Sequence, residues 1–171
     1  MPGRLTGEII NGQLHTHPRP AWPHAFTALS LGDELVSPFQ KGRGGPGGWW
    51  IVVEPEIHFV LDSEITVPDL AGWRREHMPN PPRGHKIEVV PTWVCEVLSP
   101  STKSTDRELK MPLYARHGVS YAWLVDPNTR VLEAYKRTHD GWTPLGVFRD
   151  DDVVCAEPFD AISIHLTDLW G

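Results

Sequence analysis

PTWVCEVL, residues 91–98, is the stretch that decides the fold. It has the length and the apolar, β-branched character of a buried strand, and the sequence SPST at 99–102 ends it. Glu96 is its only charged residue. Acidic side chains are rarely buried unless they are paired or bound to a metal, so Glu96 is a candidate site residue. The structural alternative is a salt bridge between Glu96 and a nearby Lys or Arg, and the strand by itself favours neither.

The sequence around this strand predicts a mixed α/β core. Thr105 can cap a helix from Asp106 to about His117, Gly118 ends that helix, and Pro112 should kink it or shorten its first turns. The other predicted elements are a helix from His24 to about Phe39, strands at 49–61, 64–70, 120–126 and 130–137, a weak strand near Phe148 and a short helix within 162–170. Since helices and strands mix, we expect a mixed β-sheet flanked by helices.

The N-terminal residues add a β-hairpin to this core. LTGEIINGQL, residues 5–14, has the pattern of two short strands joined at Asn11-Gly12, a dipeptide that two-residue hairpin turns favour. A chain of 171 residues suits one domain. We therefore expect residues 1–171 to form a single α/β domain with an extra N-terminal β-hairpin.

The composition, with 40% hydrophobic and 22% charged residues, is that of an ordinary globular protein. No run of about 20 apolar residues and no apolar secretory signal occur, so a cytoplasmic protein away from membranes is expected. The net charge of −6 argues against a general nucleic-acid binder, although a nuclease needs only an acidic metal pocket and a local basic patch. Cys95 and Cys155 lack paired spacing, which predicts two buried, reduced thiols.

Two acids are predicted to face each other on the first central strands. If 49–61 and 64–70 form a hairpin that turns at Asp62-Ser63, Glu56 lies across from Asp69 on the same face of the sheet. Like charges in that position repel, and a divalent cation with oxygen ligands would offset the repulsion. A slip of one residue in this register would turn Glu56 to the other face.

The helix after the buried strand carries a polar stripe. Asp106, Lys110 and Tyr114 are four residues apart and therefore lie on one face. The structural interpretation is an exposed Asp–Lys pair, which contributes only a few tenths of a kcal/mol. The functional interpretation places Lys110 over the end of the Glu96 strand, where it would offset charge on a phosphate or orient an attacking water. Asp106 would then position Lys110, and Tyr114 would pack or hydrogen-bond nearby.

These motifs together resemble a known family. The matching stretches are GEIINGQL (7–14), PDL (68–70), CEVLSPST (95–102), DRELK (106–110), YARHGVSYAWLVDP (114–127) and PFDAI (158–162). In this combination the chain resembles the Uma-type family of restriction-endonuclease-like proteins, within the PD-(D/E)XK nuclease superfamily. The resemblance runs over nearly the whole chain and implies a restriction-endonuclease-like core.

The resemblance also implies a metal site. Asp69 and Glu96 are its metal-binding acids, and the main-chain carbonyl of Val97 completes the coordination. The superfamily pattern has a lysine two residues after the second acid, where this chain has Leu98. The family instead places its lysine on the following helix, at the position of Lys110. Glu56, in the Glu-Pro-Glu stretch, is expected to be an accessory metal-binding and catalytic acid.

The function that follows is a Mg²⁺-dependent endonuclease, with Mn²⁺ able to substitute, which hydrolyses phosphodiester bonds in DNA rather than RNA and acts as a homodimer. Trp73, Arg74 and Arg75 form a basic-aromatic patch that could hold nucleic acid, although a solvated loop is the simpler interpretation. His24 opens the first predicted helix and could border the pocket, although a cap or surface position is the simpler interpretation. The alternative function is a catalytically inactive module of the same fold that binds a protein or nucleic acid.

Overall fold

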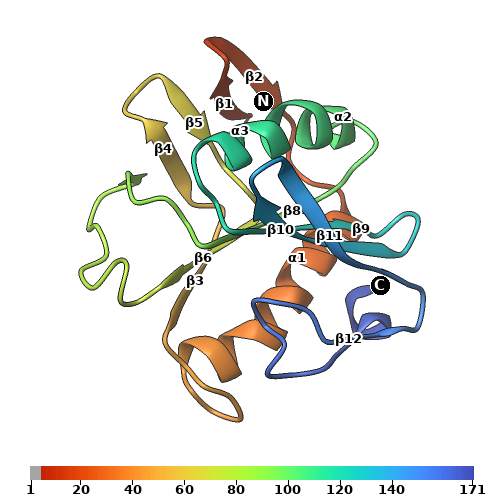
Figure 1. Cartoon of the computed structure of the whole chain (residues 1–171). Helices are drawn as coiled ribbons and strands as arrows, with labels where there is room; N and C mark the ends of the chain where they lie inside the picture. Colours follow the sequence, from red (N-terminus) through yellow and green to blue (C-terminus); the bar gives the residue numbers. More distant parts are fainter. Residues whose placement is uncertain (1–4) are drawn as a thin grey trace.

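The computed structural model describes residues 5–171 and has a six-stranded sheet at its centre (Figure 1). The strands follow the order β11–β10–β9–β8–β6–β3, and only β8 and β9 pair in parallel. Their bounds are β3 (Trp49–Val53), β6 (Leu70–Arg74), β8 (Trp93–Val97), β9 (Tyr121–Asp126), β10 (Val131–Thr138) and β11 (Gly141–Arg149). Helices cover both faces of this sheet, so the predicted mixed α/β class is confirmed.

A second sheet of five strands lies beside the first, in the order β2–β1–β5–β4–β7. Its strands are β1 (Thr6–Ile10), β2 (Gln13–His17), β4 (Glu56–Val60), β5 (Glu64–Thr66) and β7 (Lys86–Ile87). β1 and β2 form the predicted hairpin, which turns at Asn11 and Gly12. Both turn residues have positive φ values, 52° and 76°, as this kind of two-residue turn requires.

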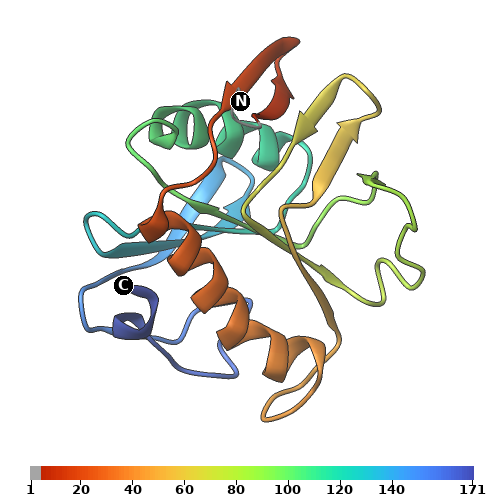
Figure 2. The same cartoon turned by 180° about the vertical axis from the view of Figure 1, so that it is seen from behind.

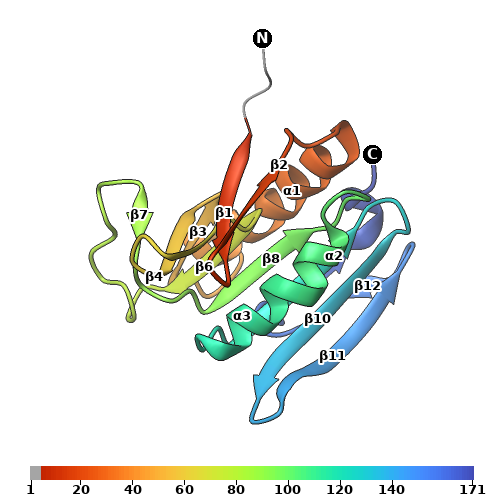
Figure 3. The ribbon, with the colours of Figure 1, turned by 90° about the horizontal axis from the view of Figure 1, so that it is seen from above.

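One long helix lies on each face of the central sheet (Figures 2 and 3). α1 (Trp22–Leu35) ends in a π-helical turn, η1 (Val36–Gln40). The helix on the other face consists of α2 (Lys103–Thr105), the π-helical turn η2 (Asp106–Lys110) and α3 (Met111–Arg116). Pro112 is the second residue of α3 and comes two residues after the end of the π-helical turn, so the wider turn lies just before the residue that lacks an N–H.

The C-terminal residues complete the layer on the α1 side. They form the strand pair β12 (Val153–Val154) and β13 (Ile164–His165) and the short 3₁₀-helix η3 (Leu166–Leu169). The short terminal helix predicted within 162–170 thus forms only at Leu166–Leu169. The weak strand predicted near Phe148 is the end of β11. No helix among residues 5–171 is long and apolar enough to cross a membrane.

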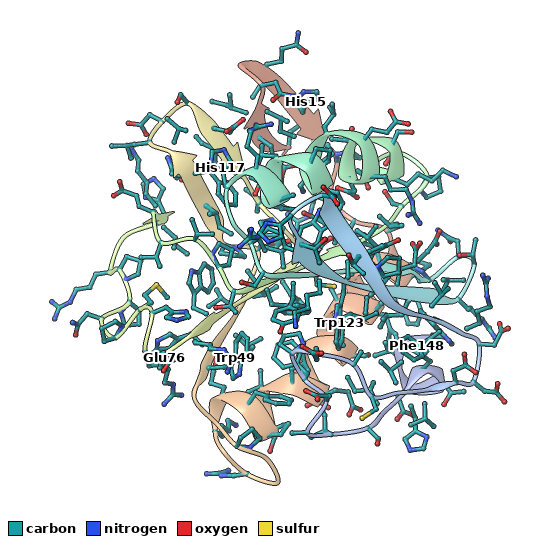
Figure 4. All side chains as sticks on the ribbon, viewed as in Figure 1. His15, Trp49, Glu76, His117, Trp123 and Phe148 are labelled. Carbon is teal, nitrogen blue, oxygen red and sulfur yellow. The ribbon has the colours of Figure 1, made fainter. Side chains whose placement is uncertain are left out.

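The side chains of β8 alternate between two cores. Trp93, Cys95 and Val97 pack with α1, whereas Val94 packs with α3 on the opposite face. The core on the α1 side includes Trp49 and Trp123, which Figure 4 labels. By the same alternation Glu96 points toward the α2–α3 helix. The alternation of side chains along β8 therefore buries Glu96, the only acid of this strand, beneath that helix.

Two long strands expected from the sequence are each divided between the two sheets. The predicted strand 49–61 breaks at Glu54-Pro55 into β3 and β4, and the predicted strand 64–70 breaks at residues 67–69 into β5 and β6. The chain crosses between the sheets twice at this point, and the Glu54 N–H donates to the Asp69 carbonyl at 3.1 Å. Asp69 therefore lies at the junction of the two sheets.

The division also changes the expected register. Val53 pairs with Leu70, so the residue across from Asp69 is Glu54, and the expected pairing of Glu56 with Asp69 is wrong. The offset is two residues, because the strands cross between sheets instead of continuing as one hairpin. The expectation of two buried thiols is half right, since Cys95 is buried and Cys155 is exposed, both as free cysteines.

Candidate active site

A cavity of about 520 Å³ opens where the β1–β2 hairpin, the start of α1, the end of β8 and the α2–η2 helix meet. Its lining includes five carboxylates and two Lys or Arg side chains, among them the exposed Glu54 and Arg19. The other five, which are less exposed, are Glu8, Asp69, Glu96, Asp106 and Lys110. These residues come from β1, the β5–β6 connection, β8 and η2, so they are far apart in sequence. The structure brings Asp69, Glu96, Val97, Asp106 and Lys110, all named from the sequence, to one place.

Lys110 lies at the centre of the acidic cluster. Its Nζ is 2.7 Å from Glu96 Oε1, 2.8 Å from Glu8 Oε2 and 3.5 Å from Asp106 Oδ1. The lysine side chain is 2% exposed, so the interpretation of Asp106 and Lys110 as an exposed pair is wrong. Burial alone lowers the pKa of Lys110, but Glu96, Tyr114, Glu8 and Asp106 together raise that pKa well above its usual value.

Tyr114 lies one helical turn after Lys110 and also contacts Glu96. Its hydroxyl donates to Glu96 Oε1 at 2.5 Å and contacts Thr66 Oγ1 at 3.2 Å. Glu96 is 2% exposed, and burial raises its pKa well above the usual value against the lowering effect of Lys110. The predicted stripe of Asp106, Lys110 and Tyr114 is therefore a buried face that holds Glu96.

Glu8 is a site residue that the sequence analysis missed. One of its oxygens, Oε2, accepts a hydrogen bond from the Val67 N–H at 2.8 Å, and the other lies 2.9 Å from His17 Nε2. Burial alone raises the pKa of Glu8, but the charge of Lys110 and the hydrogen bonds lower it to about 2. The signal was available, because Glu8 is a single acid within the apolar strand pattern TGEII, just as Glu96 is in β8.

The low pKa of Glu8 predicts a pH-dependent contribution to stability. Because folding lowers this pKa from 4.5 to about 2, ionised Glu8 stabilises the fold above about pH 4.5, and this contribution disappears as the pH falls toward 2. We expect Glu8→Gln to lower the free energy of unfolding by on the order of 3 kcal/mol at pH 7. Urea unfolding of both proteins from pH 7 to pH 3 should show the difference shrinking in acid.

The matched control for that comparison is Glu76→Gln, because the Glu76 side chain is 73% exposed. It should leave the unfolding free energy within about 0.5 kcal/mol of wild type at each pH. A Glu8→Gln difference that stays constant from pH 7 to pH 3 would contradict the assignment of the low pKa to Glu8.

Asp69 is held at the mouth of the cavity by two contacts. Its Oδ2 accepts a hydrogen bond from the Val97 N–H at 2.7 Å, which ties the sheet junction to the end of β8. Its Oδ1 lies 3.1 Å from His24 Nε2. Of the two placements considered for His24, the structure shows the one at the border of the pocket and not the cap or surface position. Burial lowers the pKa of His24, but Asp69 and Asp106 outweigh this effect and the net shift is upward.

The cavity holds more negative than positive charge. Its lining has five carboxylates against Lys110 and Arg19, and burial together with neighbouring acids raises the pKa of Asp106. A divalent cation would reduce this repulsion, and carboxylate and carbonyl oxygens are ligands that Mg²⁺ and Mn²⁺ accept. Within residues 5–171, no group of three His, Cys, Asp or Glu side chains is arranged to hold a metal ion. A main-chain ligand such as the Val97 carbonyl would therefore be needed.

Comparison with known proteins identifies the family of this chain. The model of the Uma2 family, described as "Putative restriction endonuclease", matches residues 4–167. The chain belongs to the Uma2 family. A search of curated proteins returns no match. The resemblance inferred from the sequence motifs is thus confirmed.

A similar fold is also seen in a solved structure. A crystal structure of a putative nuclease belonging to DUF820, from Anabaena variabilis, superposes with a TM-score of 0.76. The two proteins share 22% sequence identity over 99% of this chain and 93% of the other. At that identity the match speaks for the fold, and it confirms the restriction-endonuclease-like α/β architecture.

Glu56 is not part of the cavity in this Uma2 protein. It lies at the start of β4, where its Oε2 is 2.9 Å from His58 Nε2 and 3.7 Å from His85 Nε2. Glu54, which lies across from Asp69, lines the cavity instead. The expectation of an accessory acid in the Glu-Pro-Glu stretch fails for Glu56, because the sheet crossing shifts the register by two residues and places Glu54 in the cavity lining instead.

The predicted basic-aromatic patch does not form either. Trp73 is completely buried, and its indole N–H donates to the Val89 carbonyl at 2.8 Å. Arg74 lies over the ring of Trp49, with 4.7 Å from its Cζ to the ring centroid. Arg75 lies over Trp50 and donates to backbone carbonyls. Arg74 and Arg75, at the end of β6, thus pack on different tryptophans. Neither arginine lines the cavity of the candidate active site, and Trp73 does not line it either.

Proposed function

We propose that this Uma2 protein is a metal-dependent endonuclease that hydrolyses phosphodiester bonds in nucleic acid, with DNA favoured over RNA. The observation that carries the proposal is the convergence of Asp69, Glu96 and Lys110 in one cavity. The family description as a restriction endonuclease supports the same reaction. We further propose that the protein acts as a homodimer, because cutting both strands of a duplex is readily achieved by two active sites related by a two-fold axis.

Asp69, Glu96 and the Val97 carbonyl would hold the metal ion, with Mg²⁺ as the proposed cofactor and Mn²⁺ as a substitute. When bound, the ion would lower the pKa of a water ligand and polarise the scissile phosphate. The protein contributes the fixed positions of the acids. The Val97 N–H anchors Asp69 through Oδ2, and Lys110 and Tyr114 anchor Glu96 through Oε1. Glu96 therefore keeps Oε2 for a further ligand, whereas Asp69 Oδ1 already lies 3.1 Å from His24 Nε2.

Lys110 is better suited to positioning than to contact with a phosphate. Its ammonium is buried and lies within 3.5 Å of oxygens from Glu8, Glu96 and Asp106. In this arrangement Lys110 keeps Glu96 oriented, while Glu8 and Asp106 keep Lys110 charged. The superfamily pattern has a lysine where this chain has Leu98. Lys110, on the helix, would then take over only part of the role of that lysine.

The burial of Lys110 also favours the second candidate function, a catalytically inactive module that binds nucleic acid or a protein. A lysine that already bonds three carboxylates can hold a fold together without reaching a substrate. The excess of acid in the cavity favours the nuclease instead, because it creates a need for a cation that a purely structural cluster does not have.

A cleavage assay distinguishes the two functions. Wild-type protein is incubated with labelled duplex DNA, single-stranded DNA and RNA in Mg²⁺, in Mn²⁺ and in excess EDTA. The nuclease account predicts metal-dependent cleavage that EDTA abolishes, fastest on DNA. Binding of nucleic acid without cleavage in either metal would instead support the inactive module.

A further inference from the structure

The β1–β2 hairpin lines the cavity with side chains that can carry positive charge. Across the hairpin, His15 pairs with Glu8 and His17 pairs with Thr6. Both histidines therefore lie on the face of the hairpin that carries Glu8, and Figure 4 labels His15 there. Arg19 follows two residues after β2, and it lines the cavity together with the two histidines. We call His15, His17 and Arg19 the His-Arg rim.

The acids of the cavity and the His-Arg rim differ in depth. Glu8, Glu96 and Asp106 are buried. The rim is accessible, with Arg19 exposed and both histidines partly exposed. Among the acids the exposed exception is Glu54. This order suits a nucleic acid, because the reacting phosphate would approach the buried acids while accessible positive charge attracts the neighbouring phosphates.

Arg19 is the accessible one of the two Lys or Arg side chains that line the cavity. The other, Lys110, is buried among three carboxylates. Arg19 forms no salt bridge with any carboxylate of residues 5–171, although five carboxylates line the same cavity. Exposed arginines elsewhere, such as Arg107 and Arg116, each bind a glutamate. The guanidinium of Arg19 is therefore available to an external anion, and its planar fork matches the oxygens of a phosphate.

His17 is held in place by Glu8. Its Nε2 is 2.9 Å from Glu8 Oε1, and its side chain is 27% exposed. The hydrogen bond to Glu8 raises the pKa of His17 against the lowering effect of burial. Because Glu8 also binds Lys110, the imidazole has a fixed position relative to the buried cluster. A protonated His17 adds positive charge to the side of the cavity that Arg19 lines.

We propose that the His-Arg rim binds the phosphate backbone of the nucleic acid beside the scissile bond, with Arg19 as the principal contact. This inference rests on the proposed function, because it places a nucleic acid in the same cavity. A nuclease with a net charge of −6 needs a local basic patch. Residues 73–75, where the sequence predicted such a patch, do not line the cavity, and the His-Arg rim takes that role.

Fluorescence anisotropy of a fluorescein-labelled duplex DNA oligonucleotide tests the role of Arg19. Titrations are done in Ca²⁺, which oxygen ligands also accept, and in excess EDTA. Arg19→Ala should raise the Kd by about tenfold and reduce the slope of log Kd against log[KCl] by about 1, because one phosphate contact is lost. Arg19→Lys should keep the slope and lose less affinity, since it keeps the charge but not the fork.

Arg83→Ala is the matched control, because Arg83 is exposed and does not line the cavity. It removes the same charge and should leave the Kd within about twofold of wild type, since it loses no phosphate contact. In the cleavage assay Arg19→Ala should raise KM and leave kcat within about twofold, because a contact away from the scissile bond is made equally before and in the transition state. Circular dichroism checks the fold of each variant.

The outcomes separate the His-Arg rim from the function on which it rests. Arg19→Ala protein that binds and cleaves like Arg83→Ala would overturn the role of Arg19 and leave the nuclease intact. Binding that depends on Arg19, without cleavage in Mg²⁺ or Mn²⁺, would support the rim and overturn the nuclease in favour of the inactive module. A lack of wild-type binding in both Ca²⁺ and EDTA would overturn the rim.

Discussion

Lys110→Met is expected to lower the free energy of unfolding at pH 7 by about 3–5 kcal/mol. The substitution keeps most of the volume of the side chain but removes the only lysine in the cavity. Glu8, Glu96 and Asp106 then remain buried beside one another without the charge that pairs them. Breaking a buried ion pair on one side is costly for this reason, even where the intact pair adds little.

Urea unfolding followed by circular dichroism measures this effect. Lys103→Met, at an exposed position on the same helix, should change the unfolding free energy by no more than about 0.5 kcal/mol. The effect of Lys110→Met should shrink in acid, because protonation of the carboxylates removes their repulsion. A loss of less than about 1 kcal/mol at pH 7 would mean that Lys110 does not hold the cluster together.

Asp69→Asn is expected to reduce metal-dependent cleavage by about 10²–10³-fold. The substitution removes the negative charge that the proposed site needs. It should preserve the fold, because the carbonyl oxygen of the new side-chain amide can still accept the hydrogen bond from the Val97 N–H that Asp69 Oδ2 accepts in wild type. The change therefore separates the chemistry from the architecture.

Initial cleavage rates at saturating Mg²⁺ compare the variant with wild type. Asp62→Asn is the control, since that side chain is 61% exposed in the turn between β4 and β5, away from the cavity. Its rate should equal that of wild type within about twofold. An Asp69→Asn enzyme with an unchanged rate would remove Asp69 from the proposed mechanism.

The parts of the fold that the sequence predicted are those set by local periodicity. The β8 strand and the helix after it follow from an apolar run, a turn and a four-residue stripe. The same local patterns place Glu96 beneath Lys110 and Tyr114, because a strand alternates its faces and a helix repeats every four residues or so. The β1–β2 hairpin follows from Asn11-Gly12 for an equally local reason.

The errors lie where distant segments meet. Glu56 was assigned to the site from a single continuous hairpin, whereas the chain crosses between two sheets and Glu54 takes the position across from Asp69. Glu8 and His24 reach the cavity only through the tertiary packing of the hairpin and α1 against β8. The predicted basic-aromatic patch fails because β6 extends past residue 70 and buries Trp73. Local patterns contain no information on these contacts.

The measurement that tests the metal site most directly is a calorimetric titration of Mn²⁺ into wild-type protein and into Asp69→Asn, with the fold of each checked by circular dichroism. It requires no knowledge of the substrate. The proposed function predicts saturable binding to wild type that is lost in a folded Asp69→Asn variant. Equal binding by both proteins, or no binding by wild type, would contradict a metal site at Asp69 and would favour the inactive module.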